Sequence, residues 1–370
     1  MPISAVELRH ILHANPEISF KEFQTTGVLV ENITKLKNFN ETAKIMRPLE
    51  TGLVVEYKIN DGPFFIFRAD IDALGIKEET GSSFSSLNGA MHACGHDIHT
   101  AVLYGFLKEA VENKISRNCI FVFQPGEETD GGADKILKTG ILASYNIEAA
   151  YALHVTDEYD SGEIASSPGV LFASALEVDI EFMGISAHIA FPQNGKNAMN
   201  AMRLFLDHID TIPKDISNPF VFGIGKISAG SVRNIIPAGA KLEGSIRSLS
   251  SEKSMKYYEN LKTALDGIKT MTGVDYKIKT GAFYPEVVCN GHLFDKCIPV
   301  ISNKFKFIEC GYKMTGEDFG YFSKKYPALM FWLGSHDPKY GRYGLHNPKF
   351  FPGDEIIETG IRLLKEIAAL

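Results

Sequence analysis

The chain has 370 residues, of which 45% are hydrophobic and 22% charged, and its formal net charge is −7. This length predicts two domains, and the acidic balance, with no basic block to offset it, argues against a nucleic-acid partner. No apolar run approaches the length of a membrane helix. Five scattered cysteines, and an N-terminus without the features of a signal peptide, predict a cytoplasmic protein with no membrane partner.

The first 169 residues alternate between helical and strand patterns. AVELRHILHANPE has apolar residues at helical spacing and stops at Pro16. The apolar segments TGLVVEYKI, PFFIFRA, NCIFVFQ and AAYALHV predict buried strands of a largely parallel sheet. HTAVLYGFLKEAVENK and ADKILKTGIL predict helices between them. This is the pattern of an α/β domain in which helices flank a central sheet.

The pattern changes after Gly169. ALEVDIEF alternates apolar and acidic residues, which predicts a strand with one solvated face. A helix, two strands, a second helix and a last strand follow, giving the β-α-β-β-α-β order of a ferredoxin-like α+β domain. We therefore expect an inserted domain over residues 170–282. ALMFWLG and DEIIETGIRLLKEIAAL return to the α/β pattern, so residues 1–169 and 283–370 should form one discontinuous domain.

Polar, titratable residues follow several of the predicted strands. Asp70 and Asp72 come after PFFIF, and Glu127 and Glu128 come after NCIFVF. His154 ends AAYAL, while His346 lies in the loop beyond ALMFWLGS. The segment Gly89–Thr100, GAMHACGHDIHT, adds Cys94 and His96. Because ligands bind outside the carboxyl ends of strands in open α/β sheets, we expect these side chains to converge there.

Two kinds of site use this mixture of residues. Thiolate, imidazole and carboxylate are ligands of zinc and its neighbours, and a two-metal centre suits hydrolysis. One carboxylate of Glu127–Glu128 would then bind metal while the other takes a proton from water. Alternatively, Cys94 is a nucleophile beside His96 or His99. That alternative leaves Glu127, Glu128, His154 and His346 without a role, so we favour the metal site.

Several segments resemble one known family in the same order along the chain. They are RHILHANPEISFKEF, RADIDAL, MHACGHDIHT, FQPGEE, ALHV, SAHIAFP, NIIPAGAKLEGSIRSLS, TGEDFGYF and LHNPKF. Together they resemble the metal-dependent amidohydrolases related to aminoacylase, hippurate hydrolase and the plant auxin-conjugate hydrolases. The resemblance covers residues 9 to about 350 and implies hydrolysis of an N-acyl amino acid. Within the family, RADIDAL and MTGEDFGYFSKKYPALMFWLG favour N-acetyl-L,L-diaminopimelate of lysine biosynthesis as the substrate, with hippurate or another N-acyl amino acid as the alternative.

The resemblance also implies roles for individual residues. It implies two divalent transition-metal ions, zinc, manganese, cobalt or nickel, held by Cys94, His96, Glu128, His154 and His346. Glu127 matches the general base and Asp70 an acidic active-site position, and Asp72 shares the role of orienting a ligand. The substrate-binding positions are His188, Asn234 and Arg247. The insert matches a lid and dimerisation domain, so the partners implied are a small molecule and a second copy of the chain, in a homodimer or a higher homo-oligomer.

Three positions depart from the family pattern. Ser186 and Ala187 stand where two glycines usually precede the lid histidine, Gly126 stands where alanine is usual, and Gly75 where proline is usual. None of these changes removes a ligand or the base. A scaffold that has lost catalysis and only captures acylated amino acids is a further alternative, against which the intact Glu127 argues.

Overall fold

The computed structural model describes residues 2–215, 217 and 219–370. The chain divides into two compact units, described separately below. The first unit comprises Met1–Leu171, Val287–Tyr312 and Asp318–Leu370, and the second comprises Phe172–Glu286 and Lys313–Glu317. Within the described residues, no helix combines the length and apolar character needed to cross a membrane.

The first unit alternates helices and strands along the chain. Its helices are α1 (Ala5–Ala14), α2 (Phe23–Thr34), α3 (Phe39–Thr42), α4 (His96–Asn113), α5 (Glu127–Asp130), α6 (Gly132–Lys138), α9 (Gly291–Ser302), α10 (Gly320–Lys325) and α11 (Glu355–Ala368). Its strands are β1 (Ala43–Met46), β2 (Leu53–Tyr57), β3 (Phe64–Asp70), β4 (Asn118–Gln124), β5 (Ile147–Asp160), β6 (Ile164–Ser166), β7 (Gly169–Phe172), β14 (Val287–Cys289), β15 (Phe307–Glu309) and β16 (Ala328–His336).

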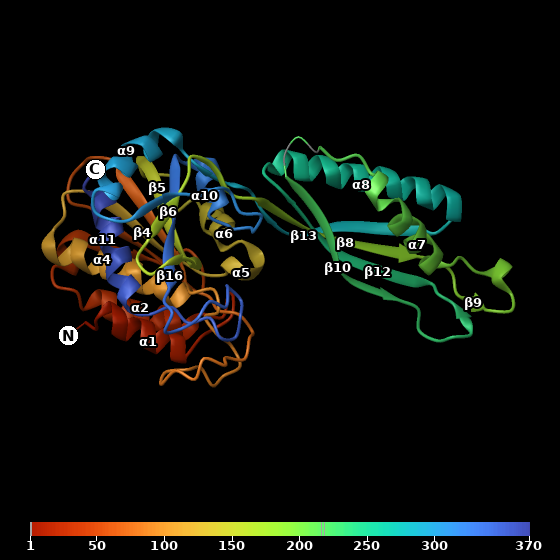
Figure 1. The fold of residues 1–370 in the computed structure, drawn as a ribbon, viewed down its shortest axis with the longest axis horizontal. Coiled ribbons are helices and arrows are strands. Elements are labelled where there is room, and N and C mark those ends of the chain that lie inside the picture. The colour runs from red at the N-terminus through yellow and green to blue at the C-terminus, as the bar shows by residue number, and fades with distance from the viewer. Residues whose placement is uncertain (1, 216, 218) are drawn as a thin grey trace. The chain divides into compact units, whose positions relative to one another are not determined.

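An eight-stranded sheet forms the middle of this unit, with α4 and α11 on one side and α6 and α10 on the other (Figure 1). The strand order is β1-β2-β4-β3-β5-β16-β6-β15. The central strands β4, β3, β5 and β16 are parallel, and every residue of β3 and β4 is buried. Continuous apolar segments such as FFIF form strands of this kind because helices cover both faces. The predicted α/β fold class is confirmed.

One predicted strand runs in an unexpected direction. The segment TGLVVEYKI forms β2, which pairs antiparallel with both β1 and β4. Only residues 58–63 separate β2 from β3. A parallel arrangement needs a crossover of a dozen or more residues, which this short connection does not provide. The sheet is therefore mixed at this edge.

The second unit is an α+β domain. It contains β8 (Ser174–Met183), β9 (Ala187–His188), α7 (Ala198–His208), β10 (Phe220–Ala229), β11 (Ile235–Ile236), β12 (Gly239–Ser248), α8 (Ser251–Thr272) and β13 (Asp275–Tyr284). The four long strands form an antiparallel sheet in the order β10-β12-β8-β13. This is the strand order of a ferredoxin-like domain, and α7 and α8 pack against the sheet (Figure 1).

The alternation in ALEVDIEF sets the orientation of β8. Leu176, Val178, Ile180 and Phe182 are each 1% exposed and lie in the core between the sheet and the two helices. The acidic residues between them face away from that core. This alternation fixes the register, since a shift of one residue would bury the carboxylates.

Candidate metal centre and active site

The site lies at the carboxyl edge of the parallel strands of the first unit. Asp70 is the last residue of β3, and Glu127 begins α5 three residues beyond the end of β4. His154 lies within β5, and His96 is the first residue of α4. Because β4, β3 and β5 are parallel, these positions meet at one edge, as the sequence predicts.

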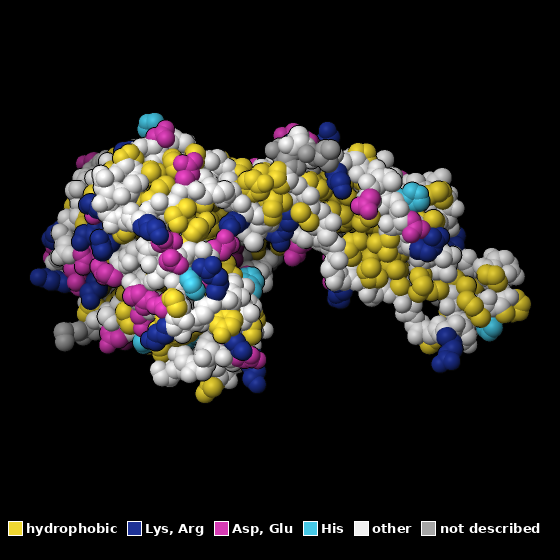
Figure 2. Space-filling model, in the orientation of Figure 1, with side chains coloured by type: hydrophobic (Ala, Val, Ile, Leu, Met, Phe, Trp, Pro, Cys, Tyr) yellow, Lys and Arg dark blue, Asp and Glu magenta, His cyan; other side chains and the backbone are white. Residues whose placement is uncertain are grey.

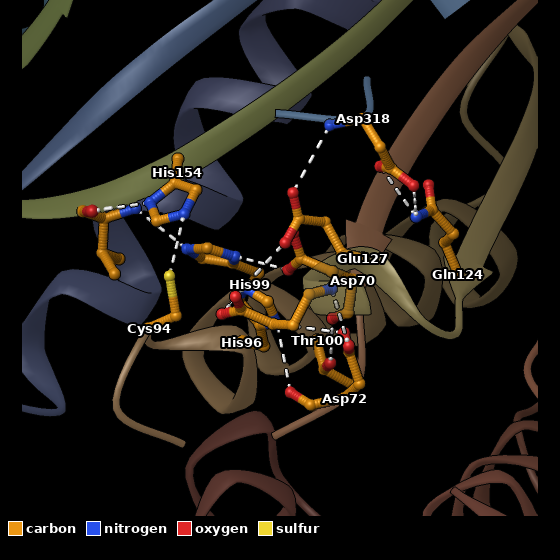
Figure 3. A network of polar contacts seen from close by, with 12 residues as sticks. Asp70, Asp72, Cys94, His96, His99, Thr100, Gln124, Glu127, His154 and Asp318 are labelled. Carbon is orange, nitrogen blue, oxygen red and sulfur yellow. Dashed lines mark hydrogen bonds and ion pairs between the residues drawn. The ribbon is translucent and has the colours of Figure 1, made fainter. Parts of the chain in front are cut away.

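The structure brings the five predicted metal ligands together. Sγ of Cys94 lies 3.4 Å from Nε2 of His154 and 3.3 Å from Nε2 of His346. Oε1 of Glu128 lies 3.4 Å from Nε2 of His346 and 3.8 Å from Nε2 of His96. Figure 3 shows Cys94, His96 and His154 pointing toward one another. These side chains come from segments up to about 250 residues apart in the chain.

Two overlapping groups of these residues have the closeness that metal ligation needs. One is Cys94, His96 and His154, and the other is Cys94, Glu128 and His346; within each, the ligand atoms lie within 4.8 Å of one another. Among the described residues, His96 Nε2 and Glu128 Oε1 are buried without a hydrogen-bond partner. Buried polar atoms of this kind require a partner, so the donor set fits divalent metal ions.

The second nitrogen of each buried ligand histidine is already held. His96 Nδ1 lies 3.0 Å from the backbone oxygen of Asp72 and 3.2 Å from its Oδ1. His154 Nδ1 donates to the backbone oxygen of Val155 at 2.8 Å. Metal-binding histidines are oriented in this way, with the other ring nitrogen fixed by a carbonyl or carboxylate. Both side chains therefore present Nε2 to the site.

The electrostatics of the site favour a cation. Burial, together with the carboxylates of Glu128 and Glu127, raises the pKa of Cys94 well above its usual value. Burial alone lowers the pKa of His96, but Asp70 and Asp72 raise it to about 10. A nucleophilic cysteine requires the opposite, a lowered thiol pKa. The carboxylates of Glu127, Glu128 and Asp70 around this thiol therefore favour a positive ion at the site.

The comparison with known families agrees with this arrangement. The model of peptidase family M20/M25/M40 matches residues 66–370. The chain belongs to this family. As a member of the M20 family, it is a hydrolase that acts on amide bonds.

Relatives within the family match along nearly the whole chain. A protein from Exiguobacterium sibiricum named N-acetyldiaminopimelate deacetylase is 39% identical over 365 residues, and 97% of each chain is covered. A Bacillus pumilus protein of the same name is 35% identical over 370 residues, covering 97% of this chain and 96% of that one. The Bacillus subtilis YXEP protein, described as a dinuclear metal binding peptidase from the M20 family, is 28% identical with a TM-score of 0.81. The match to it covers 98% of this chain and 96% of that one.

Asp70 lies beside the predicted metal ligand His96, with its Oδ2 3.7 Å from Nε2 of His96. Its Oδ1 accepts from Nδ1 of His99 at 2.6 Å, and its Oδ2 accepts from Arg68 at 2.8 Å. His99 Nε2 in turn accepts from the backbone amide of Val155 at 2.9 Å. Both ring nitrogens of His99 are thus engaged within the protein. His99 also forms a close group with Asp70 and His96, whose ligand atoms lie within 4.8 Å of one another.

The sequence predictions missed a buried network beside Glu127. Arg68 donates to Gln124 Oε1 at 2.8 Å and to Asp318 Oδ1 at 2.6 Å, and Gln124 Nε2 donates to Asp318 Oδ2 at 2.7 Å. The backbone nitrogen of Asp318 lies 3.4 Å from Oε1 of Glu127 (Figure 3). A charged residue inside the apolar strand FFIFRAD was the available signal, because buried cations need anionic partners.

The turn that carries Glu127 explains the departure at Gly126. Gly126 has φ +67°, and its amide donates to the carboxylate of Glu22 at 2.9 Å. A Cβ atom added at Gly126 would lie 2.3 Å from the ring of Phe20. The alanine that is usual in the family would collide with that ring here. The position of the Phe20 ring therefore favours glycine at position 126.

The second unit contains the three predicted substrate-binding residues. His188 in β9 pairs with Ile235 in β11, and the backbone oxygen of Asn234 accepts from the amide of Ile189 at 2.9 Å, so His188 and Asn234 are neighbours. Arg247 lies near the other end of β12, paired with Ala175. The strand from Gly239 to Arg247 alone spans roughly 25 Å. The structure therefore does not bring Arg247 together with the other two within one copy.

Proposed function

We propose that the protein is a metal-dependent deacetylase that hydrolyses N-acetyl-L,L-diaminopimelate to L,L-diaminopimelate and acetate. The convergence of five ligand-type side chains beside Glu127 is the observation that carries the reaction type. The substrate is supported by relatives of that name, which are 34–39% identical over nearly the full chain. A hippurate or general N-acyl amino acid hydrolase of the same mechanism is the alternative.

We propose Cys94, His96, Glu128, His154 and His346 as the residues that hold two divalent ions. When bound, these ions would polarise the acyl carbonyl and lower the pKa of water. The thiol among the ligands favours zinc, manganese, cobalt or nickel over magnesium or calcium.

Glu127 is the proposed general base. Its carboxylate is 6% exposed and begins α5 at the edge of the site, where it can accept a proton from the attacking water. It then returns that proton to the amine nitrogen of the leaving diamino acid. The amide of Asp318 holds one carboxylate oxygen, so the side chain needs little reorganisation during the reaction.

Arg247 is proposed to bind the free α-carboxylate of the substrate. It is half-buried on β12, and a Cβ atom at Gly316 would lie 2.7 Å from its Nη1, so that glycine leaves room for the guanidinium. An arginine fork binds both oxygens of a carboxylate. His188 is proposed to reach the scissile carbonyl, and Asn234 the polar end of the substrate.

The length of β12 bears on whether Arg247, His188 and Asn234 can bind the same substrate molecule. A small N-acyl amino acid is much shorter than the roughly 25 Å that β12 spans between Gly239 and Arg247. We therefore propose a homodimer in which His188 and Asn234 serve the site of the second copy. Figure 2 shows hydrophobic side chains gathered on the second unit, and Val221, Ile227 and Val232 of this unit are exposed.

All five cysteines are free, which supports a cytoplasmic setting.

The substrate proposal is tested with a panel of N-acyl amino acids. The purified enzyme, loaded with Zn²⁺ or Mn²⁺, is incubated with N-acetyl-L,L-diaminopimelate, hippurate and other N-acetyl amino acids, and the released acid is measured. We expect the highest kcat/KM on N-acetyl-L,L-diaminopimelate. Faster cleavage of hippurate would overturn the substrate and leave the mechanism standing, whereas no cleavage of any compound would indicate a binding protein.

A further inference from the structure

The N-terminal helix contributes a fully buried arginine to the region behind the metal centre. Arg9 in α1 is 0% exposed, and its guanidinium has three separate polar contacts. Nε donates to Asp97 Oδ2 at 3.2 Å, Nη1 to Asp354 Oδ1 at 2.5 Å, and Nη2 to the backbone oxygen of Pro352 at 2.6 Å. The partners lie 88, 345 and 343 residues away in the chain.

Two aromatic rings from other parts of the chain lie against this guanidinium. The centre of the Arg9 guanidinium lies 5.1 Å from the ring centroid of Phe351 and 5.8 Å from that of Phe84, distances typical of cation–π contacts. His13, one turn further along α1, places its ring edge-on to Phe351, and its Nδ1 lies 2.9 Å from Asp97 Oδ2. Through Arg9 and His13, helix α1 thus contacts the segment 351–354.

Both groups of contacts involve segments of the chain that carry proposed metal ligands. Asp97 directly follows His96 in the first turn of α4. The segment 351–354 closes the loop between β16 and α11, which carries His346 at φ +63°. The side chain of His346 is 51% exposed, and its backbone amide donates to the oxygen of Ala93 at 2.8 Å. A ligand on such a loop needs fixed anchor points on both sides, since loops are more mobile than the elements they connect.

We propose that Arg9 is a positioning residue for the metal centre. One guanidinium fixes the start of α4, which carries His96, to the loop that carries His346, and so holds ligands from two distant segments at the spacing that two ions require. The proposal rests on the function proposed above.

The chemistry of the side chain explains why arginine is needed. A guanidinium presents five donors in a rigid, planar fork and can serve three acceptors in different directions, whereas a lysine ammonium is a single point on a flexible stem. Arg9→Lys therefore keeps the charge beside Asp97 but cannot reach all three partners. Asp354→Ala is a second, milder variant, because Asp354 is 36% exposed. It removes the contacts of this carboxylate with Arg9 and His10 and keeps the hydrogen bond from Arg9 to Pro352.

The test is titration of the metal-free proteins with Zn²⁺ by calorimetry, together with thermal unfolding. The control is Lys365→Met, which breaks an exposed 3.0 Å ion pair that joins α11 to α4 through Glu109. We expect two bound equivalents for the wild type and the control. We expect Arg9→Lys and Asp354→Ala to weaken at least one of the two sites by about 10–100-fold, with kcat recovering at high Zn²⁺.

The outcomes separate this proposal from the proposed function. A wild type that binds no Zn²⁺ overturns the metal-dependent function itself. A wild type with two sites, and variants that unfold at lower temperature but bind Zn²⁺ with unchanged affinity, would show a purely structural role for Arg9 and overturn the inference. If Arg9→Lys does not fold, Asp354→Ala decides alone by the same criterion.

Discussion

Nδ1 of His96 lies 3.2 Å from Oδ1 of Asp72, so a carboxylate buried beneath the site fixes the ring that presents Nε2 to the metal centre. The same carboxylate accepts from the backbone amide of Glu128 at 3.0 Å through Oδ2. Asp72 therefore orients two proposed ligands at once, although it is separated from them by 24 and 56 residues.

Removing this carboxylate should loosen both ligands. For Asp72→Ala we expect metal affinity and kcat to fall about 10–100-fold, the usual effect of losing the group that holds a ligand histidine. Asp72→Asn retains one acceptor oxygen and should lie between the wild type and Asp72→Ala. Metal content after dialysis, with kcat, gives the measurement. Full metal affinity in Asp72→Ala would contradict the role of Asp72.

The turn before Glu127 depends on Gly126. Gly126→Ala combines a left-handed backbone with a clash against Phe20, so we expect a loss of about 2–3 kcal/mol in the free energy of unfolding, together with lower kcat. Gly140→Ala is the matched control, since Gly140 has φ +75° but nothing within 4 Å of the added Cβ. The control should lose only about 1 kcal/mol and keep its activity. Equal effects of the two changes, measured by denaturant unfolding and kcat, would exclude the Phe20 contact as the cause.

The proposed exchange of His188 between subunits makes a mixing experiment decisive. His188→Ala and Glu127→Gln should each be nearly inactive as pure homodimers. After the two are unfolded and refolded together, heterodimers contain one site with both wild-type residues, so about a quarter of wild-type activity should return. Size-exclusion chromatography with light scattering checks the dimer. Continued inactivity of a verified heterodimer would place His188 in its own subunit's site.

Stability should fall at alkaline pH because of His13. Burial alone lowers the pKa of His13, but the carboxylates of Asp97 and Glu78 raise it to about 9. Since the unfolded value is near 6.5, the contribution of the ion pairs is fully present below that pH and is lost as the pH rises through about 9.

Urea unfolding of the metal-free protein from about pH 6 to pH 10 measures this contribution. His13→Gln should be less stable than the wild type at about pH 6, by up to roughly 3 kcal/mol, and the difference should shrink toward pH 10. His208→Gln, at the exposed end of α7, is the control for the substitution itself. A difference that grows with pH would have the wrong sign for this account.

Much of the architecture follows from local sequence patterns. The alternation of Leu176, Val178, Ile180 and Phe182 defines the buried face of β8, because a strand buried on one face has an apolar residue at every second position. The continuous apolar segments define β3 and β4, because these strands are buried on both faces. The antiparallel direction of β2 does not follow from its apolar composition, since direction depends on the length of the connection to the next strand.

The convergence of the site residues follows from their positions at and after the ends of apolar strands. Asp70, Glu127, Glu128 and His154 lie where the carboxyl ends of these strands meet. The division of the residues into ligands, base and substrate-binding groups came from the family resemblance. The partners of Arg9 and Arg68 were missed because they are distant in the chain, although the charge of Arg68 within the apolar strand FFIFRAD signals a buried anionic partner. The separation of Arg247 from His188 likewise depends on strand register, which fixes distances that spacing alone does not.

The most direct test of the central claim is acetate release by Glu127→Gln in comparison with the wild type, with metal content measured on the same samples. The amide keeps the shape of the side chain but cannot accept the proton from water. We predict an unchanged content of two divalent ions and a fall in kcat of about 10²–10⁴-fold on N-acetyl-L,L-diaminopimelate. Near-normal turnover in a variant with full metal content would contradict the assignment of Glu127 as the base.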